Sequence, residues 1–180
     1  LCRRHGALLV FDEVQTGLGR TGRFLAAHHF GVEPDMVILA KALSGGLVPV
    51  GAGLIRAEVG RSVYSDVARA FLHASTFGEN TLAMRAGLMV LDILEDEHLL
   101  ARALRLGETL REGVAGLARR YEMVGGVRGL GLMNGIEFRP PETVRLRLLH
   151  AGFARMHPGL FGQMLVRALL REEGILTQMC

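Results

Sequence analysis

The chain has 180 residues, of which 49% are hydrophobic and 22% are charged, so it can bury a core and is expected to fold as a globular protein. A formal net charge of +3 and an aromatic content of 6% argue against a nucleic-acid-binding surface of basic and stacking side chains. The two cysteines, Cys2 and Cys180, have no paired spacing, which excludes a disulfide framework and a cysteine-rich zinc site and favours a cytoplasmic location.

The most apolar stretch runs from Met36 to Ile55 but contains Lys41, Pro49 and several glycines, so it is interpreted as buried core rather than as a membrane span. No charged segment followed by an apolar run opens the chain, and no secretory signal is predicted. The chain begins without methionine and leads directly into a strand-like segment, which indicates a sequence cut on its N-terminal side.

A βαβ unit is predicted at the start of the chain. The continuous apolar run from Ala7 to Phe11 ends at Asp12 and is typical of a strand buried on both faces of a parallel sheet. An irregular loop with three glycines follows, and then a short helix over Phe24 to Phe30. A second buried strand is predicted over Met36 to Ala40.

The rest of the chain is predicted to be rich in helices, because apolar residues recur at helical spacing over long segments. A Gly-rich part with short apolar stretches indicates strands of a smaller domain, and the domain boundary is expected near residue 96. The predicted elements are, in chain order, a strand over Ala52 to Arg56, a helix over Asn80 to Glu95, a long helix over Glu97 to Arg120, strands within Val124 to Phe138, helices over Val144 to Met156 and Phe161 to Glu173, and a closing strand over Gly174 to Thr177.

Asp12 and Lys41 are both predicted to lie just past the carboxyl end of a parallel strand, where side chains converge on the ligand crevice of an α/β sheet. They are 29 residues apart, which is the length of about one βαβ unit of ~30 residues. The right-handed crossover of such a unit returns the second strand in the same direction. We therefore expect a carboxylate and an amine at one edge of the sheet.

Lys41 is the only lysine among the 21 lysine and arginine residues of the chain. Arginine stays protonated, whereas a lysine in an apolar pocket can lose its proton and attack an aldehyde. A coding bias toward arginine could also leave one lysine by chance. The apolar run before Lys41 favours the functional interpretation, because a buried ammonium is costly unless it is paired, neutral or covalently bound.

Three segments resemble motifs of the class III aminotransferases, a branch of the fold-type I pyridoxal-phosphate enzymes. The first is Leu9 to Gly17 with Gly19 to Gly22, the second is Leu39 to Gly46, and the third is Ser75 to Gly78 with Asn80. The segments occur in the order and at the spacing of the family, and the resemblance extends over essentially the whole chain.

The resemblance implies an α/β fold with a mainly parallel sheet. Residues 1–95 would be part of the cofactor-binding large domain, and residues 96–180 would be a linking long helix and part of a smaller α+β C-terminal domain. In the family, the ring-stacking aromatic, the glycine-rich phosphate contacts and a glutamate come before the position of residue 1, and the substrate-carboxylate arginine comes after that of residue 180. We therefore expect the chain alone to be incomplete and inactive.

The resemblance also implies roles for individual residues around pyridoxal 5'-phosphate. Lys41 would hold the cofactor as a Schiff base and move a proton from the substrate α-carbon to the cofactor carbon C4′. Asp12 would pair with the pyridine nitrogen and keep it protonated, although capping a loop is the commoner fate of such an aspartate. Val14 would pack on the ring, and Gln15 would donate its amide to the phenolic oxygen.

Ser75 and Thr76 match the segment that reaches the cofactor phosphate of the neighbouring subunit, with Thr76 donating its hydroxyl. This role implies a homodimer, and an ordinary Ser/Thr turn is the alternative. Glu79 departs from the family pattern, because many members have a small residue at this position. The shape and charge of the phosphate loop therefore stay open.

The implied reaction moves an amino group from an ω-amino acid or diamine to a 2-oxo acid such as 2-oxoglutarate. Related aminomutases and decarboxylases share the motifs and remain alternatives. Asp12 and Glu13 after an apolar run also imitate the Walker B strand of nucleotide hydrolases, but no G-x-x-x-x-G-K-[ST] motif occurs. A catalytically dead dimerisation domain is a further alternative, against which the retention of Asp12, Gln15, Lys41 and Thr76 argues.

No metal site is predicted, because the histidines have no carboxylate or cysteine at ligand spacing. These histidines are His28, His29, His73, His98, His150 and His157. Arg20 and Arg23 are assigned no role, because loop arginines are usually solvated.

Overall fold

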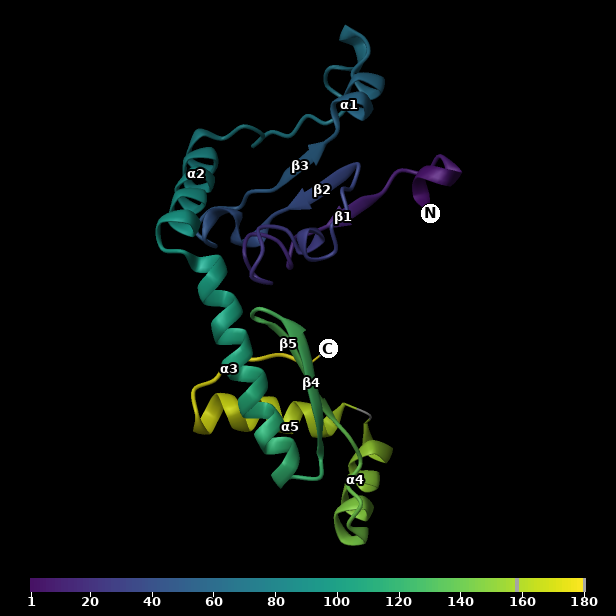
Figure 1. Cartoon of the computed structure of the whole chain (residues 1–180), viewed down its shortest axis with the longest axis vertical. Coiled ribbons are helices and arrows are strands. Elements are labelled where there is room, and N and C mark those ends of the chain that lie inside the picture. The colour runs from purple at the N-terminus through teal and green to yellow at the C-terminus, as the bar shows by residue number, and fades with distance from the viewer. Residues whose placement is uncertain (158, 180) are drawn as a thin grey trace. The chain divides into compact units, whose positions relative to one another are not determined.

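The computed structural model describes residues 1–157 and 159–179, and Cys180 lies outside the described residues. The chain divides into two compact units (Figure 1). The domain boundary after residue 95 stays a prediction, because these units reflect only contacts within this chain. Unit 1 comprises Leu1–Arg111 and Arg128–Gly135, and unit 2 comprises Glu112–Val127 and Ile136–Cys180.

Unit 1 contains a three-stranded sheet of order β1-β2-β3, in which β1 is Val10–Asp12, β2 is Met36–Leu39 and β3 is Ala52–Ile55. β1 and β2 are parallel, with Phe11 opposite Val37, which confirms the predicted direction of these two strands. β3 runs antiparallel to β2, so the sheet formed by the described residues is mixed. β2 and β3 lie within the predicted segments, whereas β1 begins at Val10 rather than Ala7 and includes Asp12.

The expected burial of the first strand is not observed in this chain. Val10 is 46% exposed and the preceding Leu8 is 55% exposed, whereas Val37 and Leu39 of β2 are buried. In the described sheet β1 is an edge strand with β2 as its single neighbour, so much of its surface faces solvent. The core of unit 1 therefore gathers around β2. It consists of Leu18, Val37 and Leu39, with Phe24, Leu25, Leu43 and Leu94 packed against them.

Two short 3-10 helices follow the strands of the parallel pair. The connection from β1 to β2 contains η2 (Ala26–His29), which is shorter than the predicted helix because Leu25 is extended and Gly31 has a φ of +60°. η3 (Lys41–Ser44) follows β2. The predicted βαβ unit is thus present as a parallel pair with a 3-10 helix in its crossover.

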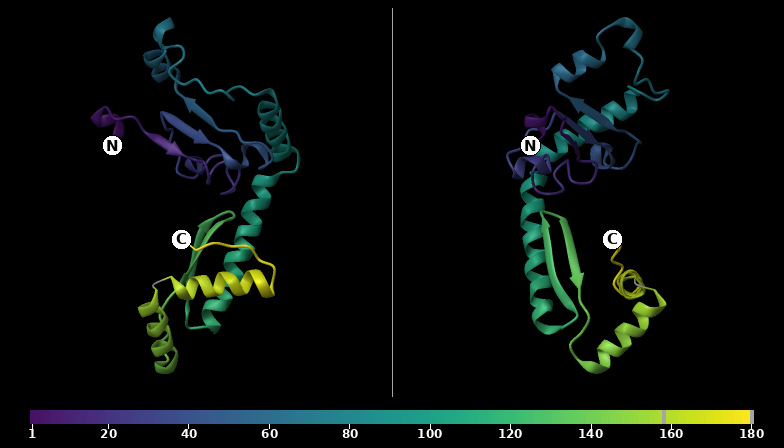
Figure 2. Two further views of the ribbon diagram at one scale, coloured as in Figure 1. Left: turned by 180° about the vertical axis from the view of Figure 1, so that it is seen from behind. Right: turned by 90° about the vertical axis from the view of Figure 1, so that its right-hand side faces the viewer.

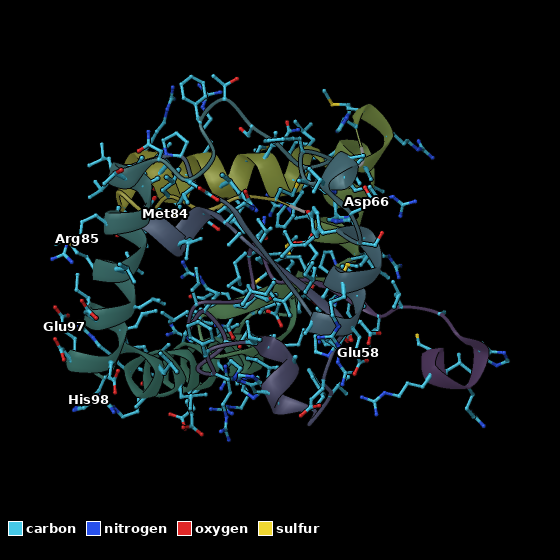
Figure 3. The ribbon with its side chains drawn as sticks, turned by 90° about the horizontal axis from the view of Figure 1, so that it is seen from above. Glu58, Asp66, Met84, Arg85, Glu97 and His98 are labelled. Atoms are coloured by element: carbon cyan, nitrogen blue, oxygen red, sulfur yellow. The ribbon has the colours of Figure 1, made fainter. Side chains whose placement is uncertain are left out.

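The helices of unit 1 follow the sheet. α1 (Ala57–Val63) comes directly after β3, and α2 (Thr81–Asp96) confirms the helix predicted over Asn80 to Glu95. The Asn80 side chain caps α2 by accepting hydrogen bonds from the N–H groups of Leu82 and Ala83, at 3.0 and 3.1 Å. A turn at Glu97 and His98, where His98 has a φ of +50°, separates α2 from the next helix (Figure 3).

The long helix α3 (Leu99–Arg120) and the strands β4 (Val124–Leu130) and β5 (Met133–Phe138) confirm the predicted elements, and the two strands pair as a hairpin (Figure 2). Unit 2 continues with α4 (Val144–Met156) and α5 (Leu160–Glu172), which contact each other. No described helix combines the length and the apolar character needed to cross a membrane.

The predicted closing strand over Gly174 to Thr177 is wrong. These residues are exposed and irregular after α5. The N–H of Ile175 donates to the carbonyl of Leu169 at 3.0 Å, so it is used to finish the helix rather than to pair with a strand. An apolar segment forms a strand only where another strand supplies hydrogen bonds, and none of the described residues does so here.

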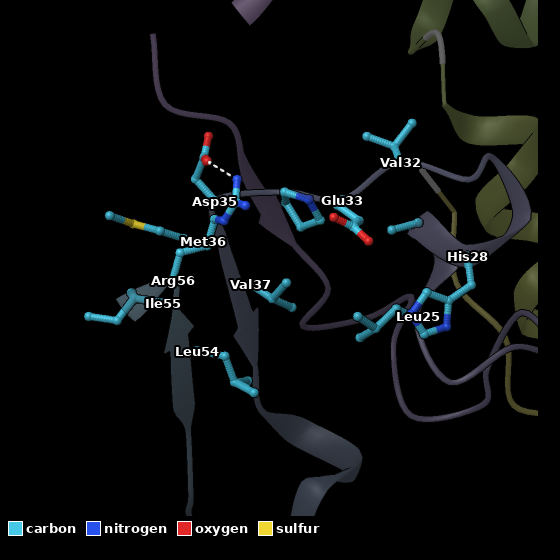
Figure 4. A pocket seen from close by; sticks show the side chains of 12 residues that line it. Leu25, His28, Val32, Glu33, Asp35, Met36, Val37, Leu54, Ile55 and Arg56 are labelled. Atoms are coloured by element: carbon cyan, nitrogen blue, oxygen red, sulfur yellow. Dashed lines mark hydrogen bonds and ion pairs between the residues drawn. The ribbon is translucent and has the colours of Figure 1, made fainter. Parts of the chain in front are cut away.

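Asp35 joins all three strands of the sheet at the amino end of β2. Its Oδ2 accepts a hydrogen bond from the N–H of Leu9 at 2.8 Å, and its Oδ1 lies 3.3 Å from Nη1 of Arg56 (Figure 4). The Leu9 N–H, and to a smaller extent Arg56, lower the pKa of Asp35 below its ordinary value of 3.8, against an opposing effect of desolvation. Folding therefore stabilises the ionised form of the Asp35 carboxyl relative to its protonated form.

We expect Asp35→Asn to lower the free energy of unfolding at pH 7, with a deficit that shrinks as the pH falls below about 4. The sign follows from the lowered pKa, because the stabilising contribution is present above the unfolded-state pKa and is lost as the pH falls through the folded-state value. Urea unfolding at pH 7 and at several lower pH values measures this difference. Asp92→Asn, on the exposed side of α2, is the matched control, and a deficit for Asp35→Asn that is independent of pH would contradict the prediction.

Candidate functional site

Asp12 and Lys41 follow neighbouring strands at one edge of the sheet. Asp12 is the last residue of β1 and lies opposite Ile38 of β2, and Lys41 is the second residue after the end of β2. Because β1 and β2 are parallel, their carboxyl ends share this edge. Both side chains are exposed. The structure thus brings the two segments together as expected from a βαβ unit.

The Lys41 backbone has a φ of +48°, in the left-handed region that non-glycine residues rarely adopt. This conformation costs roughly 1–2 kcal/mol. Lys41 is the first residue of η3 and follows the extended Ala40. The Lys41 side chain has no hydrogen bond or ion pair within residues 1–157 and 159–179. The amine is therefore free of competing partners at this position.

The apolar surroundings expected for Lys41 are not observed in this chain, because Lys41 is exposed. Val37 and Leu39 of β2 are buried, but β2 ends at Leu39. The burial of a strand therefore does not extend to a residue that follows its end. The apolar run before Lys41 correctly indicates a strand, but only Val37 and Leu39 of this strand are buried, whereas Ile38 is 42% exposed. The run says little about the lysine itself.

Asp12 precedes the short turn that continues to Gly17, and Gln15 lies within this turn. Oδ1 of Asp12 accepts a hydrogen bond from the N–H of Val14 at 3.1 Å, which is the loop-capping contact that the sequence left as the alternative for this residue. One carboxylate oxygen remains without a partner in the described part of the chain. Val14 is half-buried, and Gln15 is exposed.

Glu13 is a residue of this edge that the sequence reasoning missed. It is only 3% exposed, although it follows the exposed Asp12. Its Oε2 accepts hydrogen bonds from the hydroxyl of Thr16 and from the N–H of Ala26, at 3.1 Å for the latter, and its Oε1 accepts from the N–H of Ala27 at 2.9 Å. The sequence signal for this role is a carboxylate between an apolar strand and a glycine-rich loop. If such a carboxylate is buried, it needs several hydrogen-bond donors, which the loop can supply.

Ser44 fixes the loop after Lys41. It is 1% exposed, and its hydroxyl donates to the carbonyl of Val48 and accepts from the N–H of Val48. Helix α2 supports the same loop, since a Cβ added at Gly87 would lie 3.5 Å from the carbonyl oxygen of Leu43. The backbone around Lys41 is thus held by a buried hydroxyl and by a packed helix.

Ser75 and Thr76 lie in an exposed turn before α2, in which the N–H of Gly78 donates to the carbonyl of Ser75 at 3.0 Å. No contact of either residue with Asp12 or Lys41 is recorded within the described chain. Glu79 has a φ of +55°, a backbone conformation that glycine adopts without the steric cost that a Cβ brings. The proposed phosphate role of Ser75 and Thr76 remains a prediction.

A cavity of about 320 Å³ in unit 1 lies away from Asp12 and Lys41 (Figure 4). Its lining includes Asp35 and Met36 at the start of β2 and Ile55 and Arg56 at the end of β3. It is therefore at the opposite end of β2 from Lys41 and forms no part of the candidate site. Among the described residues, no group of three or more His, Cys, Asp or Glu side chains could hold a metal ion.

Residues 1–180 match the family model of the class-III aminotransferases. The chain is 42% identical to ornithine aminotransferase from Toxoplasma gondii ME49, with a TM-score of 0.71 over 77% of this chain and 32% of that protein. It is 40% identical to acetylornithine aminotransferase from Elizabethkingia anophelis, with a TM-score of 0.69 over 77% of this chain and 35% of that one. An amine transaminase from an uncultivated Pseudomonas species in its PLP-bound form is 38% identical, with a TM-score of 0.72 over 81% of this chain and 33% of that protein.

These similarities confirm the α/β fold of the fold-type I pyridoxal-phosphate transferases that was expected from the sequence. The chain spans about a third of the length of the solved structures that it matches.

The left-handed backbone at Lys41 predicts an unusual ranking of two variants. Lys41→Gly is expected to be more stable than Lys41→Ala by about 1 kcal/mol, because glycine adopts a positive φ without the steric cost that alanine retains. Chemical unfolding of both variants measures the difference. Ala42→Gly is the control, and it should be destabilising because residue 42 has an ordinary backbone within η3. Equal stability of the two Lys41 variants would contradict the left-handed conformation.

Proposed function

The chain belongs to the class III aminotransferases, and we propose from this membership that the whole protein is a pyridoxal-phosphate-dependent transaminase in which Lys41 is the catalytic residue. The observation that supports the proposal most directly is the parallel pairing of β1 with β2, because it gives Asp12 and Lys41 a common edge of the sheet. The matched structures named above are all aminotransferases or transaminases, which favours transamination over mutase or decarboxylase chemistry.

The residues at this edge fit pyridoxal phosphate by their chemistry. Lys41 offers a primary amine without a partner in the described chain, which is the group that an aldehyde requires. Asp12 offers a carboxylate with a spare acceptor oxygen, and Gln15 offers an exposed amide. When bound, the cofactor supplies an electron sink for the carbanion formed at the substrate α-carbon.

Lys41 would hold the cofactor through a Schiff base between its Nζ and the cofactor aldehyde, with loss of water. Once the substrate amine has replaced it on the cofactor, Nζ of Lys41 would take the proton from the substrate α-carbon as a general base and return it at the cofactor C4′ as a general acid. The absence of a hydrogen bond to Nζ in the described residues supports this role, because a proton-transfer group must be able to move between two positions. The strained backbone of Lys41 agrees with a functional position.

Asp12 would keep the pyridine nitrogen of the cofactor protonated, since a carboxylate beside a basic nitrogen favours its charged form. Its bond to the N–H of Val14 occupies one oxygen and sets the carboxylate direction. Val14 would pack on the ring, and Gln15 would donate to the phenolic oxygen. The exposure of Asp12 and Gln15 at one turn supports a common ligand for the two side chains.

Ser75 and Thr76 would bind the cofactor phosphate of a second subunit, with the Thr76 hydroxyl as donor, so that the active protein is a homodimer. The exposure of this turn supports a contact outside the chain itself. We place the reaction in the cytoplasm because the sequence has only two cysteines without paired spacing. The substrates would be an ω-amino acid or diamine donor and a 2-oxo acid acceptor, in line with the ornithine and acetylornithine aminotransferases named above.

Lys41→Ala in the complete protein is expected to abolish a visible absorption band that appears when pyridoxal phosphate is added. Lys41→Arg keeps the positive charge but offers no amine nucleophile, so it should lose the band as well. Absorption spectra with and without cofactor measure both variants. Arg23→Ala is the control for an exposed cation in the glycine-rich loop and should keep the band. A band that survives in Lys41→Ala would refute the proposed anchor.

Asp12→Asn separates the two possible roles of Asp12. Asparagine can still accept the hydrogen bond from the N–H of Val14, so the turn should keep its shape, but it lacks the charge that protonates a pyridine nitrogen. We expect kcat to fall by about 100-fold or more while the melting temperature stays within a few degrees of wild type. Steady-state kinetics and thermal unfolding test this. Unchanged activity would leave Asp12 with loop capping alone.

A further inference from the structure

The buried polar side chains of the described residues are concentrated beside the candidate site. They are Glu13, Thr21 and Ser44, each at most 3% exposed, and all three lie in the loops that follow β1 and β2. Glu13 is the one carboxylate of this set. A carboxylate is buried at a high cost unless donors surround it, so its position calls for a structural reason or a functional one.

Glu13 connects three parts of unit 1. Its N–H donates to the carbonyl of Ile38 at 3.0 Å, which extends the parallel ladder with β2 beyond Asp12. Its side chain accepts from the N–H groups of Ala26 and Ala27 at the start of η2, and from the hydroxyl of Thr16. One residue therefore ties together the sheet, the turn after β1 and the crossover helix.

The turn between Asp12 and Gly17 depends on these bonds. The N–H of Gly17 donates to the Glu13 carbonyl at 2.9 Å, and Thr16 donates to the Glu13 carboxylate, so the far end of the turn returns to residue 13. The backbone of Asp12 pairs with β2, but its carboxylate is hydrogen-bonded only to the N–H of Val14 among the described residues. Gln15, in the middle of the turn, is exposed. No other recorded side-chain bond fixes this turn to the rest of unit 1.

We propose that Glu13 is a positioning residue, which holds the turn that carries Asp12 and Gln15 in place toward the cofactor through its bonds to Ala26, Ala27 and Thr16. The inference rests on the proposed function and adds a residue that contacts neither cofactor nor substrate. Catalytic groups lose much of their effect when they are displaced by about 1 Å, so a turn that can shift would weaken both contacts together.

A carboxylate suits this position better than an amide. Glutamate presents two acceptor oxygens to three donors, whereas glutamine has one oxygen and one NH₂ group. In either orientation the NH₂ of Glu13→Gln would face the N–H of Ala26 or the N–H of Ala27. One backbone donor would then lose its acceptor, and the turn would lose part of its link to η2.

The test uses the complete protein with pyridoxal phosphate and follows the Lys41-dependent visible band as a function of pH. Gln15→Leu is the reference, since it removes the donor to the phenolic oxygen directly. We expect Glu13→Gln to weaken cofactor binding by about tenfold and to shift the pH midpoint of the band in the same direction as Gln15→Leu. In the double variant the shift should be smaller than the sum of the two single shifts.

Glu33→Gln is the matched control, because Glu33 is an exposed carboxylate of the same unit without a recorded partner, and it should leave the midpoint unchanged. If Glu13→Gln does not fold, Thr16→Val removes only the hydroxyl donor, and a smaller shift in the same direction is then expected. A lower melting temperature with wild-type midpoint and cofactor affinity would reduce Glu13 to a structural role and overturn the inference. A wild-type protein without a Lys41-dependent band would overturn the proposed function and this inference with it.

Discussion

Parallel pairing of β1 with β2 decides where the chemistry of this chain can lie, because two strands that run in the same direction end at the same edge. Asp12 and Lys41 share an edge for this reason alone. If β2 ran antiparallel to β1, as β3 does to β2, their carboxyl ends would be separated by the length of the strands. The N–H of Glu13 donates to the carbonyl of Ile38 and so extends the hydrogen bonds between β1 and β2 one residue beyond Asp12. The register of the two strands is therefore fixed next to the candidate site.

Polar groups rather than apolar ones fix the two loops at this edge. The apolar core of unit 1 is small and centred on β2, which ends with Leu39. Glu13 and Ser44, which follow β1 and β2, are buried. Glu13 accepts hydrogen bonds from Thr16 of its own loop and from Ala26 and Ala27 of η2, and Ser44 is hydrogen-bonded to the backbone of Val48. Such bonds are directional and leave a donor or acceptor unsatisfied when they break, so they specify a loop conformation more narrowly than apolar contacts can.

Structural features that depend on residues close together in the sequence were predicted well. The periodicity of α2 and α4 and the turn chemistry around β2 are local, and the length of a βαβ unit is enough to place Asp12 and Lys41 at one edge. The errors concern relations that the sequence does not contain. The segment Gly174 to Thr177 has the composition of a strand but no partner strand among the described residues. Lys41 follows a strand in which Val37 and Leu39 are buried, but Lys41 itself is exposed. Glu13 was missed because its donors Ala26 and Ala27 come 13 and 14 residues later and face it only after folding.

The left-handed backbone conformation of Lys41 sets the position from which its side chain leaves the chain, and the contacts of the surrounding fold maintain this conformation. A non-glycine residue keeps such a conformation only where its surroundings determine it, since other conformations are lower in energy for the isolated residue. Here the determining contacts are the Ser44 hydroxyl, which closes the loop to Val48, and α2, which packs on η3. Because these contacts involve backbone and a buried hydroxyl, they leave the Lys41 side chain free. In the proposed role, in which Lys41 would both hold the cofactor and move a proton, a fixed backbone and an amine without competing partners would both be needed.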